Sequence, residues 1–569
     1  MKPQGLRAKL TEYGDREFAG FIRRSFAKSM GLSGEALGKP VVGIIDTSSD
    51  LNNCHRGLPE LIAAVKRGVW QAGALPLQFP VISPGEVFCH PTSMLARNLM
   101  SMDVETMIRL QPLDAVVLAG GCDKTLPALL MGAASAGVPA IALAAGPMLA
   151  GRFRGEVAGA CTDCRRFWAM HRAGEMDARA IEEAEAALAP TAGTCAVMGT
   201  ASTMAIAAEA LGMMLPGGAT APAVLAERLR QGEETGKAAA RLAASGPAPA
   251  AVMTRDAFEN ALRAVLAAGG STNAIIHLTA IAGRLGIRID LDDLNRLSDE
   301  TPVLVDLKPT GRYFMEDLHA SGGVPALLRE MRALLRLDAP TVTGETLGET
   351  LDRASPPRGE AIRPASEPVR PEGALVALRG SLAPDGALVK RSAATPALLE
   401  ATGRALVFES VEDLARRIDR EDLDVRPDDF LLLRRAGPRG GPGMPEAGYL
   451  PIPRKLAALG VKDMVRISDA RMSGTAFGTV VLHVSPEAAA GGPLGLARSG
   501  DRIALSVKGR RLDLLVAPDE LERRRAAAAP PAPPPARGYE RLYHDAVEQA
   551  HLGADFGFLR HESLQGGGM

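Results

Sequence analysis

Short apolar runs alternate with helical stretches over the first two-thirds of the chain, and this alternation restricts the possible folds more than any other feature. "LDAVVLAGG", beginning at Leu113, is typical of a buried strand, and "VPAIALAAG" of the strand that follows. Between them lies "LPALLMGAASAG", a helical stretch closed by Gly137. "VVGIID" begins an earlier unit of this kind, with apolar residues at helical spacing over 58–69. The pattern predicts βαβ units and an α/β fold with a parallel sheet.

The texture of the sequence changes near Pro364, where we expect a second domain. At 569 residues the chain exceeds the size at which one hydrophobic core stops growing. "ALVALRGSLAPDGALVKRS" and "DRIALSVKGRRLDLLV" each place a turn between short strand patterns, which predicts a β-barrel-like domain. We therefore divide the chain into an N-terminal α/β domain, 1–363, and a C-terminal domain, 364–569. In the latter, "AAAAPPAPPPAR" is a linker and "YERLYHDAVEQAHLGADFGFL" predicts a terminal amphipathic helix.

The charge balance argues against several classes of partner. The chain has 65 Lys and Arg against 66 Asp and Glu, a net charge of -1, with no long block of one sign. This balance disfavours a nucleic-acid or anionic-membrane surface and favours small solutes. "MKPQGLRAKLTEYGD" has no apolar core of signal-peptide length, and the longer apolar stretches are broken by Gly and Pro. We expect a soluble, cytoplasmic protein, whose six cysteines are too sparse for a disulfide scaffold.

Three cysteines share a local pattern: Cys54 in "LNNCHRG", Cys122 in "GGCDKT" and Cys195 in "AGTCAVMGTAS". Each lies in a loop beside a predicted helix, where backbone N–H groups and the helix dipole stabilise a thiolate. Thiolates suit an iron-sulfur cluster or zinc, and three of them leave one cluster position open for water or substrate. The spacing also allows three buried cysteines, because no short metal-binding motif is present.

A further pair, Cys161 and Cys164, forms the only C-x-x-C of the chain, in "GACTDCRRFW". One such pair without a second is weak support for zinc, and no redox-type strand and helix context accompanies it. We expect this pair not to be required for function.

Carboxylates occur in the same loops as the cysteines. Asp123 adjoins Cys122, Glu86 lies in "SPGEVF", and Glu446 lies in "GGPGMPEAGY". Carboxylate oxygens suit Mg²⁺. Taken singly, each residue is also typical of a solvated surface acid.

One loop, "SDARMSGTAFGT", carries the hydroxyls of Ser473 and Thr475. Such hydroxyls commonly form turns, and no His or Asp stands at triad-like spacing. A serine-protease mechanism is therefore disfavoured. No phosphate-binding P-loop is present, so nucleotide chemistry has no support.

Five motifs in order resemble the dihydroxy-acid dehydratase and phosphogluconate dehydratase family: "CDKTLPALLMGAASAGVPAI", "GTCAVMGTASTMAIAAEALGMMLPG", "GGSTNAIIHL", "GPRGGPGMPE" and "SDARMSGTAFGTVVLHVSPEAAAGGP". The resemblance runs from about Val42 to the terminal "GADFGFL". It implies an N-terminal α/β domain, a C-terminal β-barrel domain, and a homodimer or homotetramer. It also implies Mg²⁺ and an iron-sulfur cluster, with [2Fe-2S] favoured over [4Fe-4S].

The family's functional residues carry over motif by motif. The cluster ligands of the family match Cys54, Cys122 and Cys195. Its magnesium shell matches Glu86, Asp123, Lys124 and Glu446. In the family this lysine is typically carbamylated and so becomes an oxygen ligand. Its proposed base matches Ser473, and Thr475 lies close to it. The expected catalytic residues are therefore Ser473, Thr475 and Lys124.

Within the family, the C-terminal motifs resemble the sugar-acid branch, such as arabinonate or xylonate dehydratases. The branched-chain amino-acid enzymes usually have Thr-Asp-Gly-Arg-Phe-Ser-Gly where this chain has Ser-Asp-Ala-Arg-Met-Ser-Gly. The resemblance thus implies conversion of a pentonate or hexonate to its 2-keto-3-deoxy acid. The alternative is the dihydroxy-acid dehydratase of branched-chain amino-acid biosynthesis. Two stretches depart from the family: "GACTDCRRFW" replaces a Gly- and Ser-rich stretch, and His90 replaces an arginine common in sugar-acid relatives.

Overall fold

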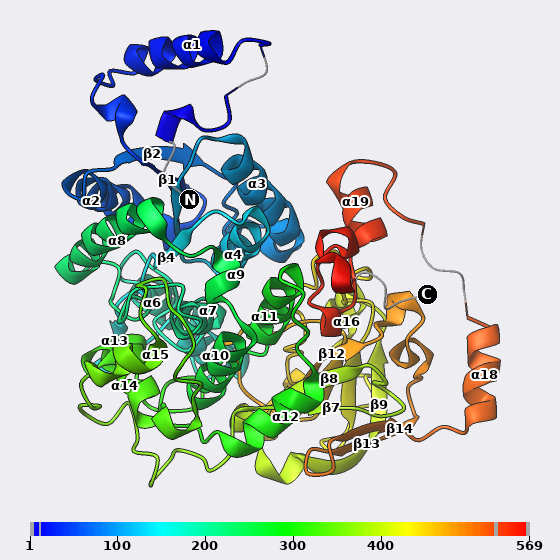
Figure 1. The fold of residues 1–569 in the computed structure, drawn as a ribbon. Helices are drawn as coiled ribbons and strands as arrows, with labels where there is room; N and C mark the ends of the chain where they lie inside the picture. Colours follow the sequence, from blue (N-terminus) through cyan, green and yellow to red (C-terminus); the bar gives the residue numbers. More distant parts are fainter. Residues whose placement is uncertain (1–4, 11–12, 529–532, 565–569) are drawn as a thin grey trace.

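Four parallel strands form the centre of the N-terminal half of the computed structural model, which describes residues 5–10, 13–528 and 533–564 (Figure 1). Their order in the sheet is β2-β1-β3-β4. The strands are β1 Val41–Asp46, β2 Leu75–Pro80, β3 Ala115–Gly120 and β4 Ala140–Ala144. Each neighbouring pair is parallel. The expected α/β fold with a parallel sheet is therefore confirmed.

Helices connect these strands. α2 (Leu58–Gln71) follows β1, α3 (Arg97–Leu110) precedes β3, and α4 (Thr125–Ala136) joins β3 to β4. The apolar residues of α2 that recur at helical spacing are all buried. α4 ends at Gly137, whose φ of 72° lies in the left-handed region and whose N–H donates to the Ala133 carbonyl. The sequence pattern located α2 and α4 correctly.

α8 (Ala226–Ser245) packs directly on α2, and glycines allow this close approach. A Cβ on Gly68 would lie 1.9 Å from the carbonyl oxygen of Glu233, and one on Gly236 would lie 2.2 Å from that of Val65. No side chain fits at either position. The backbone contact fixes α2 behind the loop that carries Cys54.

Further helices complete the N-terminal half. They are α1 Arg16–Ser29, α5 Thr162–Arg172, α6 Ala178–Leu188, α7 Thr200–Ala210, α9 Pro249–Val252, α10 Arg255–Ala267, α11 Asn273–Arg284, α12 Leu291–Glu300, α13 Met315–Ala320, α14 Gly323–Glu330 and α15 Leu347–Asp352. A short antiparallel pair, β5 Gly151–Phe153 and β6 Glu156–Ala158, precedes α5. Across the described residues, no helix has both the length and the apolar composition that crossing a membrane requires.

Eight strands form a second sheet, which curves until its edges nearly meet (Figure 1). Their order is β14-β13-β9-β10-β11-β12-β8-β7. The strands are β7 Leu375–Leu378, β8 Gly386–Lys390, β9 Glu400–Phe408, β10 Phe430–Leu433, β11 Arg466–Ser468, β12 Val480–Ser485, β13 Arg502–Ser506 and β14 Arg511–Leu514. A bridge between Arg379, just after β7, and Arg511 joins the two edges. The second sheet is therefore barrel-like, as expected.

The middle of this sheet is parallel, from β9 through β12, and its flanks are antiparallel. Alternate residues of β10 face different apolar clusters, because successive side chains point to opposite faces of a strand. Leu432 packs with Ile467 in one cluster, whereas Leu433 packs with Leu414 and Leu456 in the other. The second cluster includes the helices α16 Val411–Arg417 and α17 Arg454–Ala458.

The chain then leaves the barrel through α18 (Pro518–Ala526), and α19 (Gly538–Ala546) follows the Pro/Ala linker. Part of the linker lies outside the described residues. The terminal helix ends at Ala546 and is therefore shorter than the amphipathic pattern predicts.

After α19 the chain turns back on itself: Val547 bridges Phe556 in antiparallel fashion, and the Glu548 N–H donates to the Asp555 carbonyl. The carbonyls of Gly553 and Ala554 accept hydrogen bonds from the Arg97 guanidinium at 2.9 and 2.8 Å. Asp555 Oδ2 lies 2.6 Å from Arg284 Nε, and both side chains are fully buried. The C-terminal segment is thereby held against α3 and α11.

Candidate active site

Most of the predicted site residues lie in loops that follow the carboxyl ends of parallel strands, where open α/β sheets place their ligand crevices, whereas Cys195 lies between α6 and α7. In the N-terminal sheet, Cys54 follows β1, Glu86 follows β2, and Cys122 lies two residues after β3. The barrel contributes in the same way, since Glu446 follows β10 and Ser473 follows β11. Both sheets therefore direct loops toward one site.

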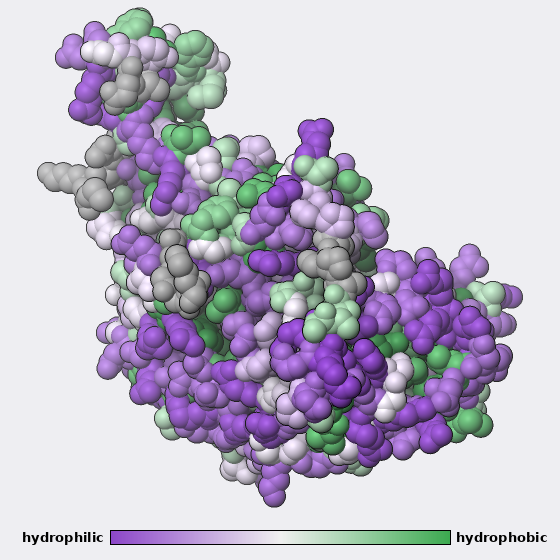
Figure 2. All heavy atoms as spheres, turned by 90° about the vertical axis from the view of Figure 1, so that its right-hand side faces the viewer, coloured by the Kyte–Doolittle hydropathy of each residue, from purple (hydrophilic) through white to green (hydrophobic). Residues whose placement is uncertain are grey.

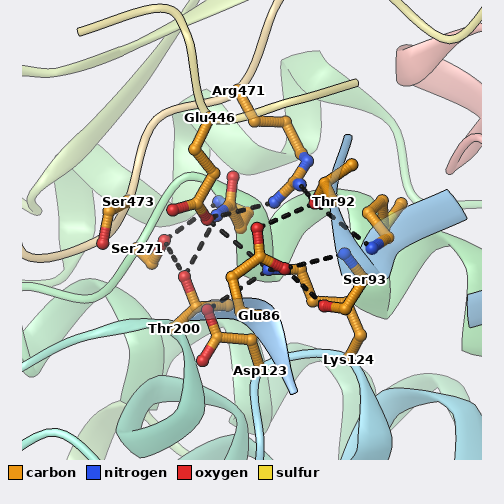
Figure 3. A network of polar contacts seen from close by, with 12 residues as sticks. Glu86, Thr92, Ser93, Asp123, Lys124, Thr200, Ser271, Glu446, Arg471 and Ser473 are labelled. Atoms are coloured by element: carbon orange, nitrogen blue, oxygen red, sulfur yellow. Dashed lines mark hydrogen bonds and ion pairs between the residues drawn. The ribbon is translucent and has the colours of Figure 1, made fainter. Parts of the chain in front are cut away.

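Lys124 lies among three carboxylates (Figure 3). Its Nζ is 2.9 Å from Glu86 Oε2, 3.3 Å from Asp123 Oδ2 and 3.6 Å from Glu446 Oε1. The lysine side chain is only 1% exposed. Because Glu446 comes from the C-terminal sheet and the other two carboxylates from the N-terminal sheet, the two halves of the molecule meet at this ammonium.

Burial and ion pairing shift the pKa values of Glu86 and Lys124 in opposite directions. Burial alone would raise the pKa of Glu86, but the charges of Lys124 and Arg471 hold that pKa well below its usual value. Burial would lower the pKa of Lys124, but the surrounding carboxylates hold it above its ordinary value. The pKa of Asp123 is raised, chiefly by burial. A charged lysine facing an ionised Glu86 is therefore the stable state at neutral pH.

Arg471 is a residue of the site that the sequence reasoning did not single out. Its buried guanidinium donates from Nη1 to Glu446 Oε1 at 3.2 Å, from Nη2 to Thr92 Oγ1 at 3.1 Å and from Nε to the Met444 carbonyl at 2.8 Å. Thr92 in turn donates to Glu86 at 2.8 Å. The arginine thus orients carboxylates from both domains. Its signal was its place within "SDARMSG", a motif that the sequence analysis uses for its hydroxyls and for the substrate branch but not for its arginine.

Asn273 orients Glu446 from the opposite side. Its Nδ2 donates to Glu446 Oε1 and to Thr200 Oγ1, each at 3.1 Å. Thr200 also contacts Ser271, with 3.0 Å between the two hydroxyl oxygens. The motif "GGSTNAIIHL" therefore supplies polar support to the carboxylate set (Figure 3).

Ser473 and Thr475 lie on the loop after β11, with 2.8 Å between their hydroxyl oxygens. Ser473 is half-buried, whereas Thr475 is 1% exposed. Two contacts hold the loop: Lys390 Nζ lies 3.5 Å from the Gly474 carbonyl oxygen, and Thr162 Oγ1 donates to the Thr475 carbonyl at 3.1 Å. Burial lowers the pKa of Lys390 to about 7. The loop therefore carries a positioned hydroxyl pair.

The cysteines gather beside the carboxylate set, in pairs. Cys54 and Cys122 lie close enough for each thiol to shift the pKa of the other. Cys195 Sγ lies 3.7 Å from Cys161 Sγ, and Cys164 contacts Cys161 in turn. Cys195 and Cys54 lie close enough to interact electrostatically. The structure thus brings the three predicted cluster ligands together and adds Cys161.

His55, which the sequence reasoning also missed, supports the Cys122 loop. Its Nε2 accepts hydrogen bonds from the backbone N–H groups of Gly121 and Cys122, both at 2.9 Å. Its Nδ1 therefore carries the proton, and it lies 2.8 Å from the Thr47 carbonyl oxygen. Burial lowers the pKa of His55 to about 4, which keeps the ring neutral. The only signal was its position next to Cys54.

The donor sets fit the two cofactors that the family resemblance implies, by chemical type. Thiols are soft donors that suit iron-sulfur clusters, and carboxylates are hard donors that suit Mg²⁺. In the part of the chain that the structure describes, no three His, Cys, Asp or Glu side chains are arranged to hold a single metal ion. On the carboxylate side, the Lys124 ammonium itself takes the place of a cation among the oxygens.

Comparison with known proteins identifies the family of the chain. The profile for the dihydroxy-acid/6-phosphogluconate dehydratase N-terminal domain matches residues 39–350, and the profile for the C-terminal domain matches residues 360–554. L-arabonate dehydratase of Azospirillum brasilense is 48% identical, covering 96% of each chain. L-arabinonate dehydratase of Rhizobium leguminosarum bv. trifolii is 46% identical, covering 98% of this chain and 97% of the relative.

A dihydroxy-acid dehydratase from Carboxydothermus hydrogenoformans is less similar, at 39% identity over 94% of this chain and 97% of the relative. The resemblance inferred from the motifs is confirmed, including its sugar-acid branch. The chain belongs to the dihydroxy-acid/6-phosphogluconate dehydratase family.

Proposed function

We propose that this protein is a hydro-lyase that converts a pentonate or hexonate to its 2-keto-3-deoxy acid. The observation that carries the proposal is the adjacency of Cys122 and Asp123. Cys122 joins the thiol set through Cys54, and Asp123 joins the carboxylate set through Lys124. A soft and a hard donor set side by side suit a substrate that needs two different Lewis acids at neighbouring carbons.

We assign Cys54, Cys122 and Cys195 to an iron-sulfur cluster, and Glu86, Asp123, Glu446 and Lys124 to the Mg²⁺ shell. When bound, the cluster would assist departure of the C3 hydroxyl, and Mg²⁺ would stabilise negative charge on the C1 carboxylate and the C2 oxygen. Lys124 joins the Mg²⁺ shell as an oxygen donor only after carbamylation. Iron, sulfide, magnesium and zinc analysis of anaerobically purified protein tests this assignment, because a structural zinc protein would contain no sulfide.

Ser473 is the residue that we assign to removal of the C2 proton. Its Oγ is held by Thr475, and its loop is held by the contacts of Lys390 and Thr162. As its alkoxide, Ser473 takes the C2 proton, and the electron pair of the broken C2–H bond forms the C2–C3 double bond while the C3–O bond breaks. The departing hydroxide takes the proton from Ser473 Oγ and leaves as water, which restores the alkoxide. The resulting enol tautomerises to the 2-keto acid. A positioned base of this kind contributes roughly 10²–10⁴-fold to rate.

The substrate class is tested by activity on a panel of pentonates and hexonates, with 2,3-dihydroxyisovalerate as the comparison. A site that hydrogen-bonds a polyol tail leaves its polar groups unpaired against an apolar tail, a penalty that reaches about 10⁴-fold. We expect kcat/KM for the best sugar acid to exceed that for dihydroxyisovalerate by at least roughly a hundredfold. Comparable efficiency on dihydroxyisovalerate would favour the branched-chain alternative and leave the dehydratase chemistry in place.

We also propose that the protein is cytoplasmic and forms a homodimer or homotetramer. The projecting helix α1 supports the assembly. Its side chains Phe18, Phe21 and Phe26, with Met30 just beyond it, are between 47% and 69% exposed. Figure 2 shows apolar side chains among polar ones on this projecting lobe. Exposed apolar side chains of this size are typical of surfaces that another chain covers. Light scattering of the wild type and of a Phe21→Ser, Phe26→Ser variant tests whether α1 holds the copies together.

A further inference from the structure

Cys161 has no role in the three-thiolate site, although it lies within that site. It stands in the stretch that departs from the Gly- and Ser-rich pattern of the family. Its Sγ lies 3.7 Å from the Sγ of Cys195, so its sulfur atom is in contact with that of an assigned cluster ligand. It is also the N-cap residue of α5, where helix N–H groups and the helix dipole favour a thiolate.

The separation of the two sulfurs has a chemical meaning. Two thiolates bound to one tetrahedral metal ion at about 2.3 Å lie about 3.8 Å apart. Cys161 and Cys195 already have this spacing. Cys54 and Cys122 are a second pair of neighbouring thiols, close enough for each to shift the pKa of the other. Two pairs of thiolates, one pair for each iron, are the donor set of a four-cysteine [2Fe-2S] cluster.

We propose that Cys161 is a fourth thiolate ligand of the cluster in the resting protein and shares an iron with Cys195. The inference rests on the proposed function, because it requires the iron-sulfur cluster. Cys161 would occupy the coordination position that a three-thiolate set leaves open. A sugar acid that binds through its C3 hydroxyl therefore competes with Cys161 for this position.

Cys164 provides a matched control for Cys161. It lies on the first turn of the same helix and, like Cys195, is a neighbour of the Cys161 thiol. Unlike Cys195, it is not one of the assigned cluster ligands. Substitution of Cys161 also leaves the helix cap intact, because its side chain makes no capping hydrogen bond. Any spectroscopic change confined to Cys161 variants thus reports on the cluster rather than on the fold of the loop.

The experiment compares wild type, Cys161→Ala, Cys161→Ser and Cys164→Ala, each purified and reconstituted without oxygen. Iron and sulfide content, visible absorption and the electron paramagnetic resonance of the reduced cluster are measured. We expect equal iron and sulfide in all four proteins. We expect both Cys161 variants, and not Cys164→Ala, to show shifted absorption bands and g values and to lose their iron faster in air. Addition of a substrate sugar acid should move the wild-type spectrum toward that of Cys161→Ala.

The outcomes separate this inference from the proposed function. Absence of iron and sulfide from the wild type would overturn the proposed cofactor and the inference together. Iron and sulfide in the wild type, with spectra of the Cys161 variants identical to it, would overturn the inference alone. Recovery of a Cys161–Cys195 disulfide from the iron-loaded wild type would also overturn it.

Discussion

The two halves of the site differ in what holds their donor groups in place. On the oxygen side, Glu86 and Glu446 are bound by hydroxyls, an amide and a guanidinium, and Lys124 compensates their charge. On the sulfur side, the thiols contact chiefly one another. The oxygen side is therefore organised by the protein itself, whereas we expect the final geometry of the sulfur side to depend on the cluster proposed above. The same chain thus preorganises one donor set and leaves the other adaptable.

Removal of one thiolate should break the sulfur side alone. We expect Cys122→Ser to lose the cluster, with activity falling beyond the roughly 10²–10⁴-fold that loss of a single proton-transfer group causes. The oxygen side should persist, so Mg²⁺ binding by calorimetry should be retained. Cys164→Ser, from outside the proposed ligand set, should keep its iron. Full iron content in Cys122→Ser would show that the ligand assignment is wrong.

Ser473→Ala should affect neither donor set and yet stop the chemistry. We expect turnover to fall roughly 10²–10⁴-fold, because only the proton-accepting oxygen is removed. Iron content and Mg²⁺ affinity should stay at wild-type levels. Exchange of the substrate C2 hydrogen with deuterium from solvent should disappear with turnover. Exchange that persists in the variant would transfer the role of the base to Thr475 or another group.

Lys124→Met tests how far the oxygen side organises itself. Without metal, the variant leaves three carboxylates facing one another, and breaking a buried ion pair in this way costs about 3–5 kcal/mol in the free energy of unfolding. The pKa of Glu86 is depressed in the folded state, so this stabilisation is complete above its unfolded pKa and declines as pH falls. The difference between the two proteins should therefore narrow below about pH 4.3.

Urea unfolding at pH 7 and pH 4 measures this difference. Lys390→Met is the matched control, because Lys390 is equally buried and its contact is a carbonyl rather than a carboxylate. We expect Lys390→Met to cost far less than Lys124→Met. Equal losses would mean that burial, and not the carboxylates, determines the stability at Lys124.

His55→Phe should reduce iron retention less than Cys122→Ser does, and it tests whether the backbone supports the sulfur side. The change removes the acceptor of two buried N–H groups, at about 1–3 kcal/mol for each. It should also weaken iron retention by roughly 10–100-fold, as loss of a group that orients a metal ligand does. Unfolding by urea and the rate of iron release to a chelator are the measurements. Wild-type iron release in this variant would exclude a role for His55 in orienting Cys122.

Local patterns predicted local structure well. The apolar spacing of α2 and the glycine at the end of α4 gave the correct helices, because both signals act within a few residues of the chain. The same held for the loops that carry Cys54 and Cys122, which follow directly from the strand ends. Their assignment to a cluster remains a prediction.

Contacts between segments that are distant in the chain could not be predicted from the sequence patterns. Nothing near Arg471 indicates Thr92, and nothing near Cys195 indicates Cys161, because each pairing arises only when separate loops converge. The terminal helix was overestimated for the same reason. Its amphipathic pattern continues, but Val547 pairs with Phe556, so the chain turns back there instead of extending the helix. The near-closure of the barrel at Arg379 and Arg511 is likewise a long-range event.

The convergence of distant loops on one site has a consequence for the synthesis of the protein on the ribosome. The hydrogen bond from Arg471 to Thr92 joins residues 379 positions apart. On the ribosome, Cys54 and Cys122 emerge long before Glu446 and Ser473, and at roughly 5–20 residues per second the interval lasts tens of seconds. During that time the nascent chain carries these thiols without the carboxylate and hydroxyls that the barrel loops supply. If the proposed cluster is bound, we expect it to be loaded after synthesis, and the thiols to need a reducing environment until the barrel has formed.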